Sequence, residues 1–545
     1  MQTGKKGAVF RTERKAETGQ FPVQRERLKK GRRPTMQKQP SIRRNFLMNT
    51  ILRAANVIFP LITILYVSRI LLPAGLGRVS FATSFIAYFN MAAQLGIPTY
   101  GIRACAKVRD DKEELSRVTL ELLLLNLIGT VISYAAITLC LLFIPRVRAD
   151  KILFIILSLT IILNAIGMEW LYQGLEQYTY ITIRSLIFKT VALAAVFLLV
   201  KEQKDVLIYA GISIFASSAS NILNFLHAQK YVDLHSAIVR GRNGLSQETV
   251  GSVNRAAETV RGDGAGINLR RHLKPVIVLF AMVCAVTVFS GLDEVMLGFI
   301  RTDADVGIYH AAVRIKVALV DIITALSVVL LPRASYYVEH ERTKDFLRIT
   351  DKGMRFVLLT GAGLTVYFML YAGETVLFLF GPEFESSILP MILIMPVVLL
   401  TGMTRVMGNQ ILIPQGREKI VLHSVTAGAM ADVILNAILI PGLGPSGAVI
   451  GTLAAEMIIV LVQLPSVKEE VGGTVRGFLN WRIAVAIILS IAVSFWIKHL
   501  QIGLLWKLIV SCLLFFSVYI GSLLLLKDPL AEEAFHWVKG KIPGR

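Results

Sequence analysis

Long apolar runs recur along the whole chain and are separated by short polar segments. A transmembrane helix needs about 20 predominantly apolar residues, and each of these runs approaches that length. The pattern therefore predicts an all-α polytopic membrane protein with about fourteen transmembrane helices. The predicted spans are residues 45–70, 76–98, 116–143, 150–172, 178–200, 205–229, 274–300, 305–331, 353–373, 386–413, 419–440, 446–466, 481–498 and 503–526.

The longest polar segment, residues 230–273, divides these spans into six and eight. Six-span repeats joined by a linker are a known transporter design, so we expect two six-helix lobes and two extra C-terminal helices. The extra helices carry almost no polar residues and are expected to face lipid. The expected divisions are a basic cytoplasmic tail (1–44), an N-terminal lobe (45–229), a cytoplasmic linker (230–273), a C-terminal lobe (274–467), the two extra helices (468–527) and a cytoplasmic tail (528–545).

A weak internal echo supports two related halves. Gly77 opens the second predicted span and Gly307 opens the eighth, each after a short turn. Both of those helices then end in an apolar residue followed by proline, at Ile97-Pro98 and at Leu331-Pro332. Matching positions in two halves favour a repeat of the same orientation.

The formal net charge of +21 is unevenly distributed over the predicted loops. Of 58 Lys and Arg residues, 43 lie in the N-terminal segment and the loops on its side of the membrane, 10 in the opposite loops and 5 within spans. Such an excess marks the cytoplasmic side. We therefore expect a multi-pass protein of the bacterial cytoplasmic (plasma) membrane with both termini in the cytoplasm. The charge is assigned to topology and membrane lipids, not to nucleic acid.

Residues 1–35 differ from the rest because they hold 11 Lys and Arg residues and lack the apolar core of a signal peptide. One interpretation is a disordered basic arm that touches anionic lipid. The other is that residues 1–35 are not translated and that synthesis begins at Met36, since the codons of Arg32 and Arg33 could form a ribosome-binding site. We favour the second interpretation.

Ten ionisable residues fall well inside the predicted spans. Exposing them to lipid would cost about 3 kcal/mol each, or roughly 30 kcal/mol together, which exceeds the stability of a typical domain. Most must therefore face a protein interior or a water-filled cavity. They could pair with one another and lock helices together, or the cations could line a cavity for an anionic ligand. The ten are Arg53, Lys189, Asp293, Glu294, Arg314, Lys316, Asp321, Arg405, Asp432 and Glu456.

The seventh predicted span shows how such charges can be sheltered. One of its faces is small and polar, because four residues recur at helical spacing: Thr287, Gly291, Glu294 and Gly298. Asp293 lies about 100° round the helix from Glu294. The large residues expected to meet lipid are Val288, Val295 and Phe299. In the next span, Arg314 and Asp321 share one face and Lys316 points elsewhere.

No motif for chemical catalysis stands out. The segment GLGPSG, residues 442–447, matches a dinucleotide-binding pattern but follows a predicted membrane helix, and such a site needs a strand before its turn. We read it as a tight turn. The chain lacks the P-loop motif, so it does not drive transport by hydrolysing ATP itself, and no metal site or cofactor is expected beyond a possible coupling ion, a proton or sodium.

Four stretches resemble the bacterial polysaccharide transporters, the flippases for lipid-linked oligosaccharides in the multidrug/oligosaccharidyl-lipid/polysaccharide exporter superfamily. The stretches are SRILLPAGLGRVSFATSFIAYFNMAAQLGIPTYGIRACAKVRDDKEELSRV (68–118), MEWLYQGLEQYTYITIR (168–184), LDEVMLGFIRTDADVGIYHAAVRI (292–315) and ILIPQGREK through ADVILNAILIPGLGPSGAVIGTLAAE (411–456). The resemblance covers roughly residues 41–467. It implies two six-helix lobes, a central cationic cavity, alternating access and two optional extra helices.

The resemblance also implies the cargo, a repeat unit on undecaprenyl diphosphate, in cell-surface polysaccharide biosynthesis. Arg suits a diphosphate because its planar fork binds bidentately. We therefore expect Arg53, Arg314, Lys316 and Arg405 to bind the diphosphate. For charge pairing or ion coupling we expect Asp293, Glu294, Asp432 and Glu456. Two departures stand out: the family pattern usually has Asn at position 432, and Arg405 matches none of its motifs.

Two other functions are considered beside this flippase. A multidrug or small-molecule cation antiporter could use the same fold, but its cavity should be acidic, whereas the ten buried charges include five cations. A membrane polymerase or ligase of the same pathway would be an enzyme and should carry a large outer loop. The longest predicted outer loop, residues 374–385, is short. We expect a transporter that is not an enzyme and that works beside a polysaccharide polymerase.

Overall fold

The structure is a computed structural model that describes residues 42–239, 267–478, 481–529 and 531–532. Its described part is helical and contains no strand. Eleven of the described helical segments are long and apolar enough to cross a membrane. The expected basic arm at residues 1–35, the alternative start at Met36 and much of the expected linker lie outside the described residues. The all-α polytopic fold class is confirmed, and the number of fourteen spans stays a prediction.

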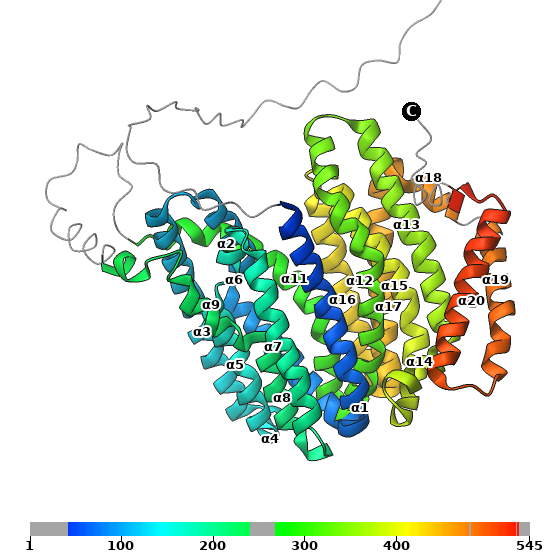
Figure 1. The fold of residues 1–545 in the computed structure, drawn as a ribbon, viewed down its shortest axis with the longest axis horizontal. Helices are drawn as coiled ribbons and strands as arrows, with labels where there is room; N and C mark the ends of the chain where they lie inside the picture. The colour runs from blue at the N-terminus through cyan, green and yellow to red at the C-terminus, as the bar shows by residue number, and fades with distance from the viewer. Residues whose placement is uncertain (1–41, 240–266, 479–480, 530, 533–545) are drawn as a thin grey trace, which may run out of the picture. The chain divides into compact units, whose positions relative to one another are not determined.

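The first two predicted spans form one long element, α1 (Ile42–Gln94), that is broken at Leu72. Leu72 has φ 57° and ψ 177°, and Pro73 follows it, so the helical hydrogen bonding cannot continue there. In Figure 1, the beginning of α1 and the helix after it, α2 (Ile97–Lys107), lie on the same side of the molecule. The chain therefore reverses direction at Leu72, where the sequence predicts a short turn.

After α2 the described chain continues as a series of α-helices up to α9. They are α3 (Lys112–Phe143), α4 (Pro145–Ala149), α5 (Lys151–Gly167), α6 (Glu169–Gly174), α7 (Tyr178–Leu199) and α8 (Val206–Ile214), with a π-helical turn leading into α9 (Asn221–Ala228). Local sequence fixes several of these ends. Asp111 caps α3 by accepting from the backbone N–H groups of Glu113 and Glu114. Met168, in the left-handed region, separates α5 from α6 inside what the sequence predicts as one span.

A second group begins with α11 (Arg270–Ile300) and α12 (Asp303–Glu339), which cover the seventh and eighth predicted spans. It continues through α13 (Thr343–Leu370), α14 (Ala372–Leu379), α15 (Ile388–Arg405), α16 (Glu418–Leu443) and α17 (Pro445–Gln463). The predicted turn at residues 442–447 does join two helices, α16 and α17, and Gly444 has φ 54° there. Its helix–turn–helix setting excludes the strand that a dinucleotide site needs.

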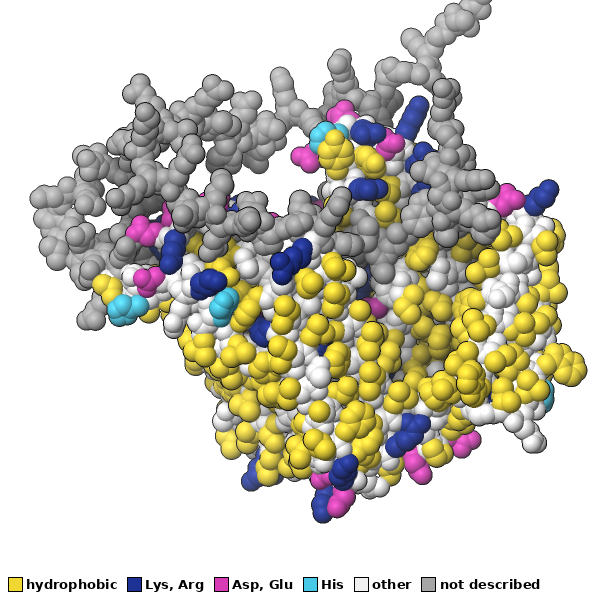
Figure 2. Space-filling view, in the orientation of Figure 1, with side chains coloured by type: hydrophobic (Ala, Val, Ile, Leu, Met, Phe, Trp, Pro, Cys, Tyr) yellow, Lys and Arg dark blue, Asp and Glu magenta, His cyan; other side chains and the backbone are white. Residues whose placement is uncertain are grey.

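The chain ends with α18 (Lys468–Phe478), α19 (Trp481–Phe495) and α20 (Leu504–Leu525). The expectation that α19 and α20 only face lipid is wrong in one respect, because they pack on α13 through buried hydroxyl groups. The Tyr367 hydroxyl lies 2.9 Å from the Ser511 hydroxyl, and the Tyr519 hydroxyl donates to the Leu359 carbonyl at 3.2 Å. Figure 1 shows the two helices at the edge of the bundle, and Figure 2 shows apolar side chains covering the bundle between its two ends.

The two positions of the sequence echo meet in the fold, where α1 packs on α12. A Cβ atom on Gly77 would lie 1.8 Å from the Asp303 carbonyl oxygen, and one on Gly307 would lie 2.0 Å from the Pro73 carbonyl oxygen. Backbone therefore touches backbone at both positions, and only glycine fits either one. Nearby, Arg146 on α4 donates to the Gly298 carbonyl at 3.1 Å and forms an ion pair with Asp303.

The opposite end of α11 is tied to α3. Glu121 is fully buried and its carboxylate contacts Arg271 at 2.6 Å and His272 at 2.7 Å. The Tyr100 hydroxyl lies 2.9 Å from the other ring nitrogen of His272. A buried carboxylate needs such partners, so α11 begins against α2 and α3. Its other half packs on α16 and on the second half of α1.

Candidate functional site: a charged pocket and two carboxylate clusters

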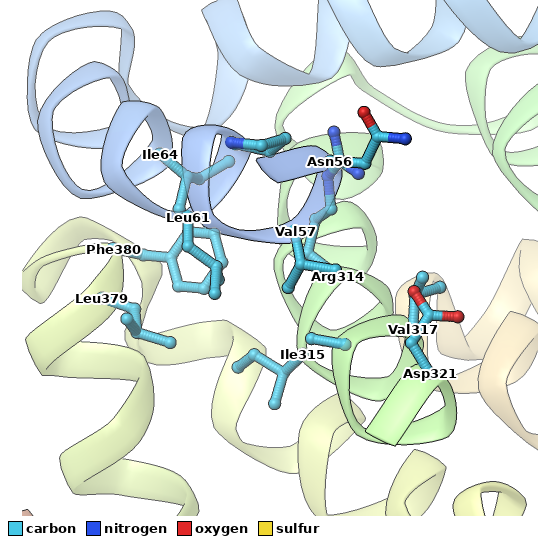
Figure 3. A pocket seen from close by; sticks show the side chains of 12 residues that line it. Asn56, Val57, Leu61, Ile64, Arg314, Ile315, Val317, Asp321, Leu379 and Phe380 are labelled. Carbon is cyan, nitrogen blue, oxygen red and sulfur yellow. The ribbon is translucent and has the colours of Figure 1, made fainter. Parts of the chain in front are cut away.

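A pocket opens between the first half of α1 and α12. Figure 3 shows Asn56 and Val57 from α1 beside Arg314 and Asp321 from α12, with Leu379 and Phe380 completing the wall. The predicted shared face of Arg314 and Asp321 is confirmed, because both line this pocket. Lys316, expected to point elsewhere, does not line it. The pocket thus has an apolar wall with one guanidinium and one carboxylate.

The four predicted diphosphate ligands form no ion pair within the described parts of the chain. Arg53, Arg314 and Arg405 are exposed, and Lys316 is half-buried. The predicted pairing of the interior charges with one another is therefore not the arrangement around these cations. A cation inside a helical bundle that lacks a carboxylate partner is costly unless water or a ligand solvates it. These four side chains are the candidates for holding an anion.

The acids nearby are close enough to feel these cations without contacting them. Asp321 lies within electrostatic reach of Arg53 and Arg405. Glu456, which is buried, lies within reach of Lys316 and Arg405, while its carboxylate accepts from the Thr401 hydroxyl at 2.8 Å. The structure thus brings charged residues from α1, α12, α15 and α17 within electrostatic reach of one another.

Asp293 lies in a buried cluster built by α11, α12, α16 and α17. Its carboxylate accepts from the Asn436 amide at 2.6 Å, from the Thr452 hydroxyl at 2.8 Å and from the Tyr309 hydroxyl. Asp432 lies beside it on α16, one helical turn before Asn436, and both are buried. We define Asp293, Tyr309, Asp432, Asn436 and Thr452 as the aspartate cluster.

Two oxygen atoms of the aspartate cluster have no hydrogen-bond donor among the described residues: Asp432 Oδ1 and Asn436 Oδ1. Both face Gly451, where a Cβ atom would lie 2.2 Å from the Asn436 oxygen and 3.1 Å from the Asp432 oxygen. No group of three or more His, Cys, Asp or Glu side chains suited to a metal ion occurs in the described residues. The cluster instead offers carboxylate, amide and hydroxyl oxygens, which hard cations prefer.

Glu294, the next residue along α11, points into a different cluster. Its carboxylate accepts from the Ser80 hydroxyl at 2.8 Å and from the Ser84 hydroxyl, and it lies 2.8 Å from Nδ1 of His310. We define Ser80, Ser84, Glu294 and His310 as the glutamate cluster. It joins the second half of α1 to α11 and α12. The predicted pairing of Asp293 and Glu294 with a cavity Arg or Lys is not seen in either cluster.

The predicted small face of α11 is largely confirmed. Gly298 packs on the Phe81 ring, where a Cβ atom would lie 2.1 Å from a ring carbon, and Gly291 lies near the Tyr88 hydroxyl. Phe299 is 44% exposed, as expected of a residue that faces lipid. Val295 is buried, so its predicted contact with lipid is wrong, because it belongs to the main apolar core between the packed helices.

Sequence reasoning missed the hydrogen-bonding partners of both carboxylates. Ser80, Ser84, Tyr309 and His310 lie in two of the stretches that resemble the family, but nothing in the sequence pairs them with Asp293 or Glu294. A usable signal existed for Asn436, which follows Asp432 by four residues and so shares its helical face. Lys189, counted among the buried charges, hydrogen-bonds the Asn56 amide oxygen across α7 and α1 and has no described carboxylate partner.

Fold and site together define a polytopic membrane protein in which four cations of the predicted spans have no ion pair among the described residues. A family model described as "Polysaccharide biosynthesis protein" matches residues 42–338, which is more than half of the 545-residue chain. The chain therefore belongs to that family, in agreement with the resemblance seen in its sequence. The model's match includes α1, α11 and α12, and so it includes Arg53, Arg314 and both adjacent carboxylates.

Two curated relatives are each named "Putative O-antigen transporter". The one from Escherichia coli (strain K12) is 23% identical over 430 residues, covering 79% of this chain and 97% of the relative. The one from Shigella dysenteriae is 23% identical over 432 residues, covering 78% and 100%. The chain thus spans nearly the whole length of both relatives.

Two solved structures share the fold. "Lipid II flippase MurJ, inward closed conformation" superposes with a TM-score of 0.63 at 14% identity, covering 90% of this chain and 99% of that one. An inward-facing multidrug resistance MATE family transporter of the MOP superfamily has a TM-score of 0.54 at 15% identity, covering 79% and 98%. At such identities the likeness concerns the fold alone.

Proposed function

We propose that this protein moves an undecaprenyl-diphosphate-linked oligosaccharide repeat unit across the bacterial cytoplasmic membrane by alternating access. The observation that carries the proposal is a set of four cations within the predicted spans that form no ion pair with any described residue: Arg53, Arg314, Lys316 and Arg405. A diphosphate is a compact anion that would neutralise such a set. The names of the curated relatives, both O-antigen transporters, support the same class of cargo.

The position of the pocket suits an amphiphilic cargo. Its cation Arg314 lies beside apolar residues of α1 and α14, including Val57, Leu61 and Leu379 (Figure 3). A diphosphate would bind Arg314 and Arg53, while the attached lipid tail stays in the bilayer along the apolar wall. Such a division leaves the charged head solvated by the protein and keeps the tail in hydrocarbon.

We further propose that the aspartate cluster holds the coupling ion, a proton or sodium. Asp432 Oδ1 and Asn436 Oδ1, the two buried oxygens without donors, fit an oxygen-ligated cation. Asp293 and Asp432 would supply the negative charge and Thr452 a hydroxyl oxygen. A bound cation would relieve the repulsion between two adjacent buried carboxylates, and so would one shared proton.

Orientation and assembly are part of the proposal. The distribution of Lys and Arg in the sequence favours cytoplasmic termini. The two groups of helices, residues 45–229 and 274–467, would be the lobes that rock, and α19 and α20 would stay with the second lobe because they pack on α13. A polysaccharide polymerase would receive the product on the other side of the membrane.

Two alternatives remain for experiment. A multidrug or small-molecule cation antiporter is favoured by the shared fold with the MATE transporter. The unpaired cations argue against it, because a cationic cargo would meet Arg314 and Arg53. A membrane polymerase or ligase would need its own catalytic groups, and no motif in this sequence supplies them.

A proteoliposome assay tests the proposal. It would follow a fluorescent undecaprenyl-diphosphate oligosaccharide with wild type, Arg53→Ala, Arg314→Ala and the control Arg109→Ala, which removes only a surface ion pair with Glu176. We expect translocation by wild type and the control, and loss of at least about tenfold in the two cavity variants, since each lost charge-assisted hydrogen bond costs about 1.5–3 kcal/mol. Equal rates in all four proteins would contradict the proposed cargo site. Drug efflux without lipid translocation would support the antiporter.

A further inference from the structure

A second pocket lies between α14, α15 and the turn that joins α19 to α20. It encloses about 980 Å³, space open to the surroundings included. Its floor is apolar and includes Leu370, Leu377, Ile388, Ile392 and Leu504. It shares no lining residue with the pocket between α1 and α12. The flippase proposal therefore leaves it unexplained.

The rim of this pocket carries more positive than negative charge. Its charged lining residues are Glu374, Lys498 and Lys507. The Lys498 ammonium lies 3.9 Å from the Glu374 carboxylate, and the Lys507 ammonium donates to the Lys498 carbonyl at 3.0 Å. Lys507 has no carboxylate partner among the described residues. One cation of the pair is thus free to hold an anion beside the other.

Two exposed tryptophans fix the depth of this rim in a membrane. Trp496 is 75% exposed and lies two residues before Lys498, and Trp506 is 63% exposed and directly precedes Lys507. Tryptophan gathers at the membrane–water interface, at the level of the lipid head groups. Lys498 and Lys507 therefore lie at head-group level, and the apolar floor extends from there into the hydrocarbon.

We propose that this pocket binds an anionic phospholipid, with its phosphate between Lys498 and Lys507 and one acyl chain along the apolar floor. The predicted topology puts the site in the outer leaflet, since the turn between α19 and α20 lies opposite the basic loops. A phospholipid is the assigned occupant, rather than the diphosphate lipid of the cargo, because the two pockets are separate. The site also gives the C-terminal helices a role. Lys507 lies on α20 and Lys498 on the turn that joins α19 to α20, so this helix pair supplies both lysines and one wall of a lipid pocket.

The test is native mass spectrometry of the purified full-length protein, titrated with phosphatidylglycerol or phosphatidylcholine in the absence of cargo. A lysine near a membrane surface contributes roughly a fivefold gain in affinity for anionic lipid. We therefore expect phosphatidylglycerol to bind more tightly than phosphatidylcholine. Lys507→Gln should weaken phosphatidylglycerol about fivefold and Lys498→Gln/Lys507→Gln roughly 25-fold. Glu374→Gln should strengthen it.

The matched control is Lys204→Gln, a 78% exposed lysine on the 3-10 turn Gln203–Asp205, which should change nothing. Equal binding of the two lipids, or wild-type binding by the double variant, would overturn the proposal. Tighter binding of undecaprenyl diphosphate, lost in the same variants, would also overturn it by making this a cargo site. If the double variant does not fold, an acyl-chain photo-crosslinking phosphatidylglycerol decides on wild type: labels in residues 369–377 and 388–392 support the pocket, and labels only elsewhere refute it.

Discussion

Asp293 and Glu294 are neighbours in the sequence and have opposite surroundings in the fold. Asp293 points into the aspartate cluster, where its partners come from α12, α16 and α17 and a second carboxylate, Asp432, lies alongside. Glu294 points into the glutamate cluster, where two serines of α1 and His310 satisfy it. The difference follows from the rotation of about 100° per residue along a helix.

The comparison shows that one buried carboxylate can have all its hydrogen-bond partners while another lies beside oxygens that lack them. In the aspartate cluster, Asp432 Oδ1 and Asn436 Oδ1 have no donor among the described residues, so the cluster can still accept a cation or a proton. The glutamate cluster has three partners for one carboxylate, and those partners link helices from both halves of the chain. We therefore expect the first cluster to bind an ion and the second to hold α1 against α11 and α12.

The largest effect is expected for Asp293→Asn. The substitution removes the charge that three donors satisfy and presents an amide N–H group to them, which costs about 3 kcal/mol or roughly 100-fold in coupled transport. Transport driven by a sodium or proton gradient should be lost, while binding of the lipid cargo is retained. Gradient-driven transport in proteoliposomes at the wild-type rate would rule out an ion site at Asp293.

Glu294→Gln should have a smaller effect of a different kind. The amide still accepts from one serine but loses the carboxylate's contact with His310, a loss of about 1.5 kcal/mol or roughly tenfold. Hydrogen–deuterium exchange should rise in peptides covering residues 72–84 and 303–312, because the contact between α1 and α12 loosens. Asp293→Asn is the control, and it should leave exchange at residues 72–84 unchanged, because the hydrogen-bond donors to Asp293 come from α12, α16 and α17. If exchange rises equally in both variants, the glutamate cluster does not differ from the aspartate cluster in holding α1 against α12.

Tyr309→Phe removes one of three donors to Asp293 without changing the fit of the ring. About 1 kcal/mol, roughly fivefold, should be lost from ion-coupled transport. The apparent affinity for the coupling ion should shift, which is measured by titrating sodium at fixed pH and then pH at fixed sodium. A change only in thermal stability, with both titrations as in wild type, would assign Tyr309 to packing alone.

Ser84→Ala should have the smallest effect. Ser80 and His310 still satisfy Glu294, so about 0.5 kcal/mol, roughly twofold, is expected. The ion titrations should match those of wild type, and hydrogen exchange at residues 72–84 should rise slightly. If Ser84→Ala shifts the ion titrations more than Tyr309→Phe does, the assignment of the two clusters must be exchanged.

The sequence predicts which kinds of residue lie within the spans better than it predicts which side chains contact one another there. Hydropathy predicts the long apolar helices. The cost of charges in lipid singles out ten residues, of which Asp293, Asp432 and Glu456 are buried and four are exposed: Arg53, Arg314, Asp321 and Arg405. Helical spacing also orients the small face of α11 correctly at Gly298 and Glu294. It cannot identify partners such as Ser80 or His310, because these contacts depend on how distant helices pack. Val295 illustrates the same limit, since its burial in the main apolar core depends on how distant helices pack.

The reciprocal contact of Gly77 and Gly307 has a mechanical consequence for a transporter of this design. The backbones of the two halves touch there, near the start of α12, so that point can act as a fulcrum. From Gly307 to the end of α12 the helix extends about 48 Å at 1.5 Å per residue. A tilt of about 15°, similar to rigid rotations seen between other protein subunits, would swing that far end by roughly 12 Å. In the proposed alternating-access cycle, α12 would thus act as a lever whose far end moves much more than the contact at Gly77 and Gly307.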